Sequence, residues 1–411
     1  MCPDADWVAM HSTGCRVALA AVVVSFIVVL TSTAPVGAVW YMDERLPAPV
    51  AMTCAVSTGM VMYVFGGATK GALLDTIWAV NPESGWTSVQ PFTLPSPRKL
   101  ASAVWTGDAA YIIGGIGYDG EPIPEIVKFV PGVGVRVIEG AMPYGTKGIP
   151  SVWSGEAIYI LGNCLSSEVG QYDVIRFDPV NETTEILEDV LPITGAGSSA
   201  TWAGDCAYIV GGRQNVTQLS DRIIRYVPGE GAEYMEARLP QGRIGAASAW
   251  NGSAVYAFGG TIALLCGPLE CVPTDYLDEM VVFTPENDTI EVFEGALPRP
   301  MDLRAAVYFD FHNETVSNRI LIPGGLMSTG PVDWICITYT EPRSIQFPPE
   351  DQTNVLALFR EWIDDNMFYI VLLIVILIIT AVSYTYITAF RKRDEERIEQ
   401  YQEFLDEKKE E

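Results

Sequence analysis

The sequence repeats one pattern of about 50 residues six times, and this repeat limits the folds that the chain can adopt. Each copy begins with a Leu-Pro or Met-Pro pair and later carries two adjacent small residues, which are Gly-Gly in every copy except Gly162-Asn163. The prolines are Pro47, Pro95, Pro143, Pro192, Pro240 and Pro298. The prolines are 48, 48, 49, 48 and 58 residues apart, and the first glycines of the pairs are 48, 48, 49, 48 and 65 residues apart, so the two series differ only in the last interval.

Each copy also predicts four short β-strands. In the fifth copy these strands end at Trp250, cover 256–258, run from Met280 to Pro285, and cover 289–293. Such segments are rich in Val, Ile, Tyr and Trp and are separated by Gly, Pro and Asn turns, which is typical of antiparallel strands. Four strands in each of six copies predict an all-β fold of six repeated sheets.

The multi-copy pattern resembles the kelch-repeat family, and the resemblance covers roughly 40–342. It implies a six-bladed β-propeller with four strands in each blade. The glycine pairs suit this fold, because glycine adopts dihedral angles closed to other residues and lets neighbouring backbones approach closely. A β-sandwich with accidental glycine pairs is the alternative, and it does not account for six copies in step.

The start of the repeat region predicts how the ring closes. The segment 41–47, YMDERLP, closely matches 234–240, YMEARLP, which is the fourth strand of the fourth copy. A fourth strand at the beginning of the chain lacks its own first three strands, so we expect Trp40 to Arg45 to complete the last blade beside the segment 334–339. Closure of this kind leaves no free sheet edge.

Two apolar segments outside the repeats predict export and a membrane anchor. Residues 17–30 carry no charge and precede small residues at 36–38, as in a signal peptide cleaved after Ala38; an uncleaved N-terminal anchor is the alternative. Residues 367–390 also carry no charge, which is long enough for a transmembrane helix, and Arg391-Lys392-Arg393 follow, which places that end in the cytoplasm. The expected organisation is a signal peptide 1–38, a propeller 39–342, a connector 343–366, a transmembrane helix 367–390 and a charged cytoplasmic tail 391–411. The sequence thus predicts a single-pass protein of the plasma membrane with its propeller outside.

If the propeller is exported, disulfide bonds and N-linked glycans are expected in it. Cys266 and Cys271 flank four residues of the longest insertion and are expected to form a disulfide bond. For Cys54, Cys164, Cys206 and Cys336, bridges and buried free thiols are equally compatible with the sequence. Five N-glycosylation acceptor patterns fall in predicted turns: Asn181, Asn215, Asn251, Asn287 and Asn313.

The composition argues against several functions. The chain has a formal net charge of −26, which disfavours nucleic acid as a partner. It has only His11 and His312, so it cannot build the multi-histidine copper site of galactose oxidase, a kelch-type enzyme. We therefore expect no metal and no cofactor. Hydrolysis by paired carboxylates stays open, because the chain has 51 acidic residues.

Four basic residues near the starts of first strands suggest a ligand site at the centre of the ring. They are Arg98, Lys147, Arg243 and Arg304. They could form a small basic mouth for a carboxylate such as a sialic or uronic acid. The alternative is that these residues tie neighbouring blades together.

Two functions follow from these observations. The first is a membrane-anchored extracellular propeller that binds a protein or glycan partner. The second is a cell-surface enzyme acting on sugars, because bacterial sialic acid mutarotases are similar six-bladed kelch proteins. The anchor and the scarcity of histidine favour the binding module.

Overall fold

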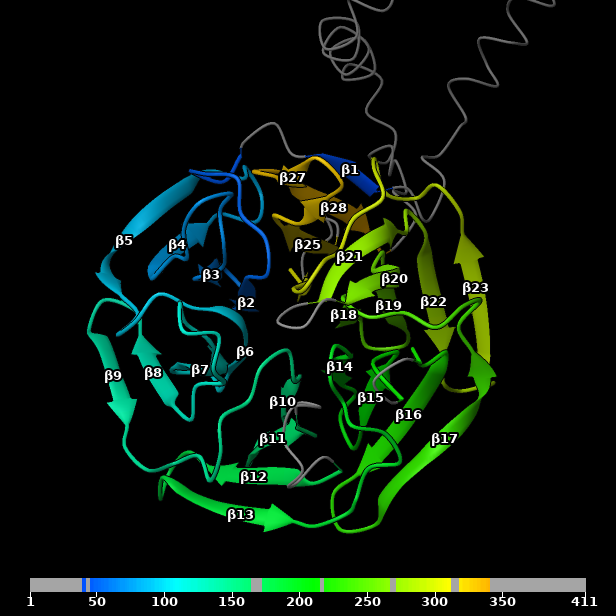
Figure 1. Cartoon of the computed structure of the whole chain (residues 1–411), viewed down its shortest axis with the longest axis horizontal. Coiled ribbons are helices and arrows are strands. Elements are labelled where there is room, and N and C mark those ends of the chain that lie inside the picture. Colours follow the sequence, from blue (N-terminus) through cyan, green and yellow to red (C-terminus); the bar gives the residue numbers. More distant parts are fainter. Residues whose placement is uncertain are drawn as a thin grey trace, which may run out of the picture. The chain divides into compact units, whose positions relative to one another are not determined.

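Six four-stranded antiparallel sheets form the blades of a ring in the computed structural model (Figure 1). The structure describes residues 39–41, 45–163, 172–214, 218–266, 271–311 and 318–340, all within one unit that spans residues 1–344. The predicted all-β fold with six blades is therefore confirmed. The expected signal peptide, connector, transmembrane helix and tail lie outside the described residues. Within the described ranges, no helix could span a lipid bilayer.

The blades follow the chain in order. Blade 1 is β2 (Cys54–Ser57), β3 (Met62–Phe65), β4 (Thr76–Val80) and β5 (Thr87–Thr93). Blade 2 is β6 (Lys99–Trp105), β7 (Ala110–Ile116), β8 (Ile126–Val130) and β9 (Gly134–Ile138). Blade 3 is β10 (Ser151–Trp153), β11 (Ile158–Leu161), β12 (Val174–Asp178) and β13 (Thr183–Leu187). Blade 4 is β14 (Ser199–Trp202), β15 (Ala207–Val210), β16 (Arg222–Val227) and β17 (Gly231–Arg238).

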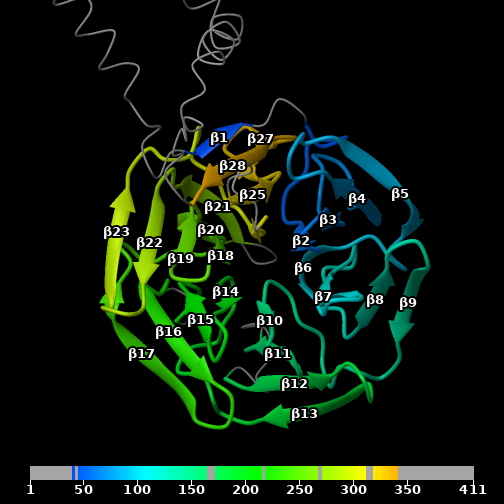
Figure 2. The same ribbon diagram turned by 180° about the vertical axis from the view of Figure 1, so that it is seen from behind.

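The last two blades carry insertions. Blade 5 is β18 (Ala247–Trp250), β19 (Val255–Phe258), β22 (Met280–Thr284) and β23 (Thr289–Phe293). Its second and third strands are separated by a hairpin of β20 (Thr261–Cys266) and β21 (Cys271–Tyr276). Blade 6 contains β24 (Val307–Phe309), β25 (Arg319–Pro323) and β28 (Ile335–Tyr339), with the short hairpin β26 (Leu326–Met327) and β27 (Gly330–Pro331) between the last two. In both views the first strands surround the centre of the ring and the fourth strands form its rim (Figures 1 and 2).

The N-terminal strand closes the ring, as the sequence predicts. Strand β1 (Val39–Tyr41) pairs antiparallel with β28, with Trp40 opposite Ile337, and so supplies the fourth strand of blade 6. Further along, the Arg45 guanidinium lies 3.0 Å from the carboxylate of Asp333 in the same blade. The predicted strand runs from Trp40 to Arg45, and 40–41 are confirmed as strand, because residues 42–44 lie outside the described chain.

The hydrophobic core is divided into six clusters, each between two neighbouring blades. The cluster that joins the first and last blades contains Val64 and Trp78 from blade 1 and Phe309 and Leu321 from blade 6. Aromatic pairs recur at four of the interfaces, with ring centroids 5.2 to 5.9 Å apart: Tyr63 with Phe129, Tyr111 with Phe177, Tyr159 with Tyr226, and Tyr208 with Phe283. Burial between blades, rather than inside one, therefore holds the ring together.

The glycine pairs fasten each blade to the next through the backbone. The N–H of Gly260 donates to the carbonyl of Met301 in the following blade over 2.8 Å. At Gly259 φ is +56°, and an added Cβ would lie 2.5 Å from the same Met301 oxygen, so a larger residue is excluded by both conformation and space. Equivalent bonds run from Gly67 to Arg98, Gly115 to Thr146, Asn163 to Thr194, Gly212 to Arg243 and Gly325 to Val50, over 2.8 to 3.0 Å.

A second series of backbone hydrogen bonds links the blades where the chain enters each first strand. It begins where the Leu100 N–H donates to the carbonyl of Met52 over 3.0 Å. It continues from Gly148 to Leu100, Gly197 to Gly148, Gly245 to Gly197, and Leu303 to Gly245, over 2.7 to 2.9 Å. This series passes from blade 1 to blade 6, and we call it the backbone belt. It places the segments that precede the first strands side by side.

Candidate ligand-binding site

The two faces of the ring carry different kinds of connection. Because strand direction alternates, one face carries the segments entering the first strands and the loops between second and third strands, and we call it the loop face. The loop face includes 66–75, 117–125, 211–214, 218–221 and 259–266 with 271–279. The other face, here the turn face, carries the short turns 58–61, 81–86, 131–133, 179–182, 251–254 and 285–288. The longest connection, the β20–β21 hairpin, therefore belongs to the loop face.

Arg98 and Arg243 are buried inside the blades. The Arg98 side chain is 0% exposed and donates to Gly114 O over 3.2 Å, to Ser96 Oγ over 2.8 Å and to Glu125 Oε2 over 2.7 Å. Arg243 is equally buried and donates to the carbonyl of Gly259 over 3.3 Å and to the Glu279 carboxylate. Their own carbonyls accept the glycine bonds of the preceding blade. Both residues thus connect adjacent blades, and their guanidinium groups are shielded from solvent.

Arg304 is held by Asp302 at the start of blade 6. Its Nε lies 2.8 Å from Asp302 Oδ1 and its Nη2 lies 3.0 Å from Oδ2, so the pair is bidentate. Asp302 is buried, and an added Cβ at Gly245 would lie 2.3 Å from its carboxylate, which leaves the carboxylate no room to move toward that glycine. Burial raises the pKa of Asp302, and the charge of Arg304 opposes the increase. The Arg304 side chain keeps 15% of its surface exposed.

Arg213, from blade 4, interacts electrostatically with Arg304 of this pair. Its backbone N–H donates to Ala196 O over 2.9 Å, and its carbonyl accepts from Thr194 Oγ1 over 3.1 Å. Burial lowers the pKa of Arg213, and the positive charge of Arg304 lowers it further.

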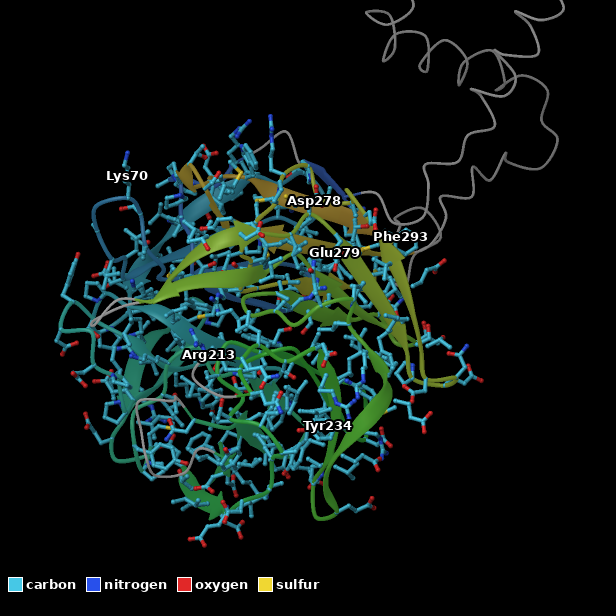
Figure 3. The ribbon with its side chains drawn as sticks, turned by 45° about the vertical axis from the view of Figure 1, so that its right-hand side comes forward. Lys70, Arg213, Tyr234, Asp278, Glu279 and Phe293 are labelled. Atoms are coloured by element: carbon cyan, nitrogen blue, oxygen red, sulfur yellow. The ribbon has the colours of Figure 1, made fainter. Side chains whose placement is uncertain are left out.

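Tyr276 connects the same group to the hairpin. It is the last residue of β21, and burial together with the negative charge of Asp302 raises its pKa. The base of the hairpin is held by Thr261 Oγ1, which donates to Asp275 O over 2.5 Å. We call Arg213, Asp302, Arg304 and Tyr276 the central cluster. Figure 3 shows the β20–β21 hairpin extending from its blade on the side of the ring where Arg213 lies.

Lys147 occupies the repeat position that Asp302 holds in blade 6, four residues after the Met-Pro or Leu-Pro pair. Lys99 holds the same position in blade 2, and both lysines are partly exposed. Two of the four predicted residues, Lys147 and Arg304, therefore belong to loop-face positions that reach solvent. The other two, Arg98 and Arg243, are buried and form ion pairs inside their blades.

Sequence reasoning missed Arg213 and Asp302. Arg213 directly follows a glycine pair, at a position that holds Ala68, Ile116, Thr261 or Leu326 in other blades. When the repeats are aligned, this position has a charged residue in one blade and small or apolar residues in the others, and that difference would have indicated Arg213. Asp302 could be found in the same way, since it replaces the two lysines of blades 2 and 3.

Three of the predicted glycosylation sites lie in described turns of the turn face. Asn181 follows β12 and Asn287 follows β22, and both are exposed. Asn251 is partly exposed, and its Oδ1 accepts from the N–H of Ala254 over 2.8 Å. Asn215 and Asn313 lie outside the described residues. Glycosylation of these residues stays a prediction.

The cysteines fall into two groups. Cys54, Cys206 and Cys336 are buried free thiols, and burial raises the pKa of Cys54 and Cys336 to about 12. Cys266 and Cys271 lie directly opposite each other in the β20–β21 register, which is the backbone arrangement that a cross-strand disulfide needs. Their side chains, and Cys164, lie outside the described part of the chain, so the Cys266–Cys271 bond stays a prediction.

Comparison with known proteins assigns the chain to no family, so its class is defined by its fold. The sequence matches no protein-family model, and no curated protein is significantly similar to it. In the described ranges, no three or more His, Cys, Asp or Glu side chains are grouped as a metal ion would require. The architecture defines the chain as a six-bladed β-propeller whose loop face carries a cluster of charged residues.

Proposed function

We propose that this protein is a kelch-type binding module that recognises a protein or glycan partner through its loop face. One observation carries the proposal: the longest insertion of the ring, the β20–β21 hairpin, stands on the same face as the central cluster, with Tyr276 linking the two. Loops on a rigid scaffold are where recognition residues concentrate, because they vary without disturbing the blades. The described turns of the turn face named above have three to six residues.

The kelch assignment draws support from details of the repeat. The glycine pair adopts positive φ and donates to the next blade, and buried Arg98 and Arg243 repeat the same contacts in blades 2 and 5. Each of these features follows from one recurring sequence pattern. A shared pattern that performs the same structural task in each blade is what a kelch repeat requires.

The positions of the chain ends support display on a membrane. Strand β1 begins at Val39, directly after the predicted cleavage site, and β28 ends at Tyr339 on the turn face. Since β1 and β28 are antiparallel, the chain enters β1 and leaves β28 at that same face. A connector 343–366 and an anchor 367–390 would then hold the turn face nearest the membrane, with the loop face directed outward into the extracellular space.

The test is partner capture by the full-length protein in detergent, on arrays of cell-surface proteins and glycans. A variant in which residues 262–275 are replaced by a short Gly-Ser turn should lose the captured partner. A matched variant of the turn face, Val180→Ser, should keep it, because Val180 is exposed on the opposite side. Capture that survives loss of the hairpin but disappears with Val180→Ser would contradict the proposal, and chemical conversion of an arrayed sugar would indicate an enzyme instead.

A further inference from the structure

We infer that blades 1 and 2 rest on the surface of a lipid bilayer through three exposed side chains of the turn face, Met60, Trp86 and Val133. We call these residues the apolar tips. The inference deepens the proposed function and rests on it, because it requires the membrane anchor that is proposed to follow the propeller. It is carried by the exposure of the tips, by the residues that other blades hold at the same positions, and by the point where the chain leaves the ring.

The apolar tips lie in short turns of two neighbouring blades. Met60 is in the turn between β2 and β3, Trp86 directly precedes β5, and Val133 is in the turn between β8 and β9. These residues are 76%, 61% and 75% exposed, so they contribute little to the hydrophobic core. Single exposed apolar residues are common on protein surfaces, whereas several on one face indicate a surface that contacts something apolar.

The position of Met60 is polar in the next four blades. The equivalent residues there are Asp108, Glu156, Asp205 and Ser253. The backbone of the turn is the same, because Thr58 N–H donates to Val61 O and Thr106 N–H donates to Ala109 O, each over 3.0 Å. The turn therefore accepts a charged residue at this position, and folding does not require a methionine.

The position of Val133 is acidic in blade 4. Val133 lies in a Pro-Gly-Val-Gly turn, and the same turn of blade 4 reads Pro-Gly-Glu-Gly with Glu230. The N–H of Val133 donates to Val130 O over 3.0 Å, and the N–H of Glu230 donates to Val227 O over 3.1 Å. Two turns with one geometry thus carry opposite kinds of side chain, and the apolar kind is in the blade nearer to the ring closure.

The turn that carries Trp86 is fixed to blade 6. Within the turn, Asn81 Oδ1 accepts from the N–H groups of Glu83 and Ser84, both over 2.9 Å. Arg319 of β25 donates to the carbonyl of Pro82 over 3.2 Å, which ties the turn to the last blade. The backbone is therefore held while the tryptophan stays mostly exposed. Tryptophan is enriched at membrane interfaces, because its ring is apolar and its N–H is polar.

The chain leaves the ring for its predicted anchor beside the blades that carry the apolar tips. Strand β28 of blade 6 ends at Tyr339 on the turn face, and blade 6 packs against blade 1 in the cluster that closes the ring. Residues 341–366 can span at most about 90 Å before the uncharged segment 367–390 begins. The turn face therefore stays within reach of the bilayer, and the tether makes a weak contact with lipid intramolecular.

The distribution of the tips favours a lipid surface over a groove in a partner protein. They stand on separate turns, and a bilayer interface can accept apolar side chains that are separated from one another. The described turns of this face contain no Lys or Arg, so nothing in them attracts anionic lipid, and we expect zwitterionic lipid to suffice. No predicted glycosylation acceptor falls in blade 1 or blade 2. Val180 is also exposed, but it adjoins the acceptor Asn181 and is not counted among the tips.

Photocrosslinking in lipid nanodiscs tests the inference. The full-length protein is placed, one chain in each disc, in phosphatidylcholine that contains a diazirine-bearing phosphatidylcholine, and lipid adducts are located by peptide mass spectrometry. We expect adducts at Met60, Trp86 and Val133 and within 367–390. The loop-face residue Tyr118, which is 71% exposed, should carry none. Addition of phosphatidylserine should not increase the adducts at the tips.

Substitutions taken from other blades supply variants that should fold. Met60→Asp and Val133→Glu introduce the residues that equivalent turns already hold. Each should lower the ratio of lipid-bound to free propeller about tenfold, the effect of losing the burial of one apolar side chain, and should reduce the adducts at Trp86. Ile186→Glu is the matched control, because Ile186 is 42% exposed on the rim strand β13 near its loop-face end, and it should leave those adducts unchanged. Equal unfolding temperatures of all three variants show that the fold is kept.

The labelling pattern separates failure of this inference from failure of the proposed function. Adducts within 367–390 without adducts at the tips would overturn the lipid contact and leave display on the membrane intact. Absence of adducts at both places would overturn the anchor and the contact together. Equal loss in Ile186→Glu, or tip adducts that appear only when a disc holds two chains, would also overturn the lipid contact, and the second result would assign the tips to a second copy of this chain. Partner capture through the hairpin is independent of each result.

Discussion

The buried Arg243–Glu279 pair gives the sharpest quantitative test of the blade-to-blade architecture. Replacement of Arg243 by Met removes the guanidinium but leaves the Glu279 carboxylate with 11% of its side chain exposed. Loss of one partner of a buried ion pair destabilises a protein by about 3–5 kcal/mol, because the remaining charge is neither solvated nor paired. Burial disfavours the charged form of Arg243 and lowers its pKa. The hydrogen bond and the negative charge of Glu279 oppose this decrease.

Arg98 provides an internal control with nearly identical surroundings. It makes the same contact with the first glycine of its own blade, to Gly114 O, and its carbonyl accepts from the preceding blade in the same way. Its partner Glu125, however, is 37% exposed and can be hydrated when the arginine is removed. Arg98→Met should therefore lower the free energy of unfolding by about 1–3 kcal/mol, as for a lost charged hydrogen bond.

Denaturant titration followed by tryptophan fluorescence measures both changes. The double variant Arg243→Met with Glu279→Gln should regain most of the loss, because it replaces the stranded carboxylate with a neutral amide. Equal destabilisation by Arg98→Met and Arg243→Met, or no recovery in the double variant, would refute the argument that burial of the partner sets the size of the effect.

Three further predictions follow from described contacts. Gly259→Ala should destabilise the ring by more than the ~1–2 kcal/mol that left-handed φ imposes on an L-residue, because its Cβ would meet Met301 O at 2.5 Å; Gly252→Ala, with positive φ but open space, should show the conformational effect alone in thermal unfolding. Because the pKa of Asp302 is raised, the folded state holds that proton more tightly than the unfolded state. The stability of the wild type relative to Asp302→Asn should therefore increase as pH falls from about 7 to 4, and a constant difference would contradict the burial of a charged carboxyl. Peptide mass spectrometry after alkylation of the native protein should find Cys54, Cys206 and Cys336 unmodified and, without reductant, Cys266 joined to Cys271; labelling of Cys266 before reduction would exclude the bond.

The fold could be predicted because the repeat expresses a physical requirement in the sequence. Gly259 and Gly260 lie where only glycine lets the backbone approach a neighbouring segment closely. This requirement therefore appears in the sequence as a glycine pair. Ring closure was predictable for a similar reason, since the segment at 41–47 matches a known fourth strand and lacks strands of its own. A structural requirement that recurs in each blade produces a recurring sequence pattern, and such a pattern can be recognised in a single sequence.

The site was harder to predict, because it depends on which repeat positions reach solvent. Arg98 and Arg304 look alike in sequence, as basic residues at the start of a first strand. In the structure the first points into its own blade toward Gly114 and Glu125, whereas the second is turned onto Asp302 and stays partly exposed. Relative to the repeat proline, Arg304 lies three residues further along the segment than Arg98. This difference in position decides whether the side chain is buried in its blade or reaches solvent. Arg213 stands out only when the repeats are aligned at the residue after each glycine pair, and Arg304, whose charge acts on it, comes from two blades further along the chain.

The closing strand has a consequence for the order in which the molecule can assemble. Trp40 pairs with Ile337, so the earliest strand of the domain finds its partner only after nearly three hundred further residues have left the ribosome. Contacts with such long separation in sequence form late, because the chain between them must first be ordered. Until that moment both the last blade and the inner surface of the first lack a neighbour, and their apolar cluster stays open to water. A nascent chain of this architecture therefore needs protection until its final blade is synthesised, and changes in β1 should harm yield more than the stability of the finished protein.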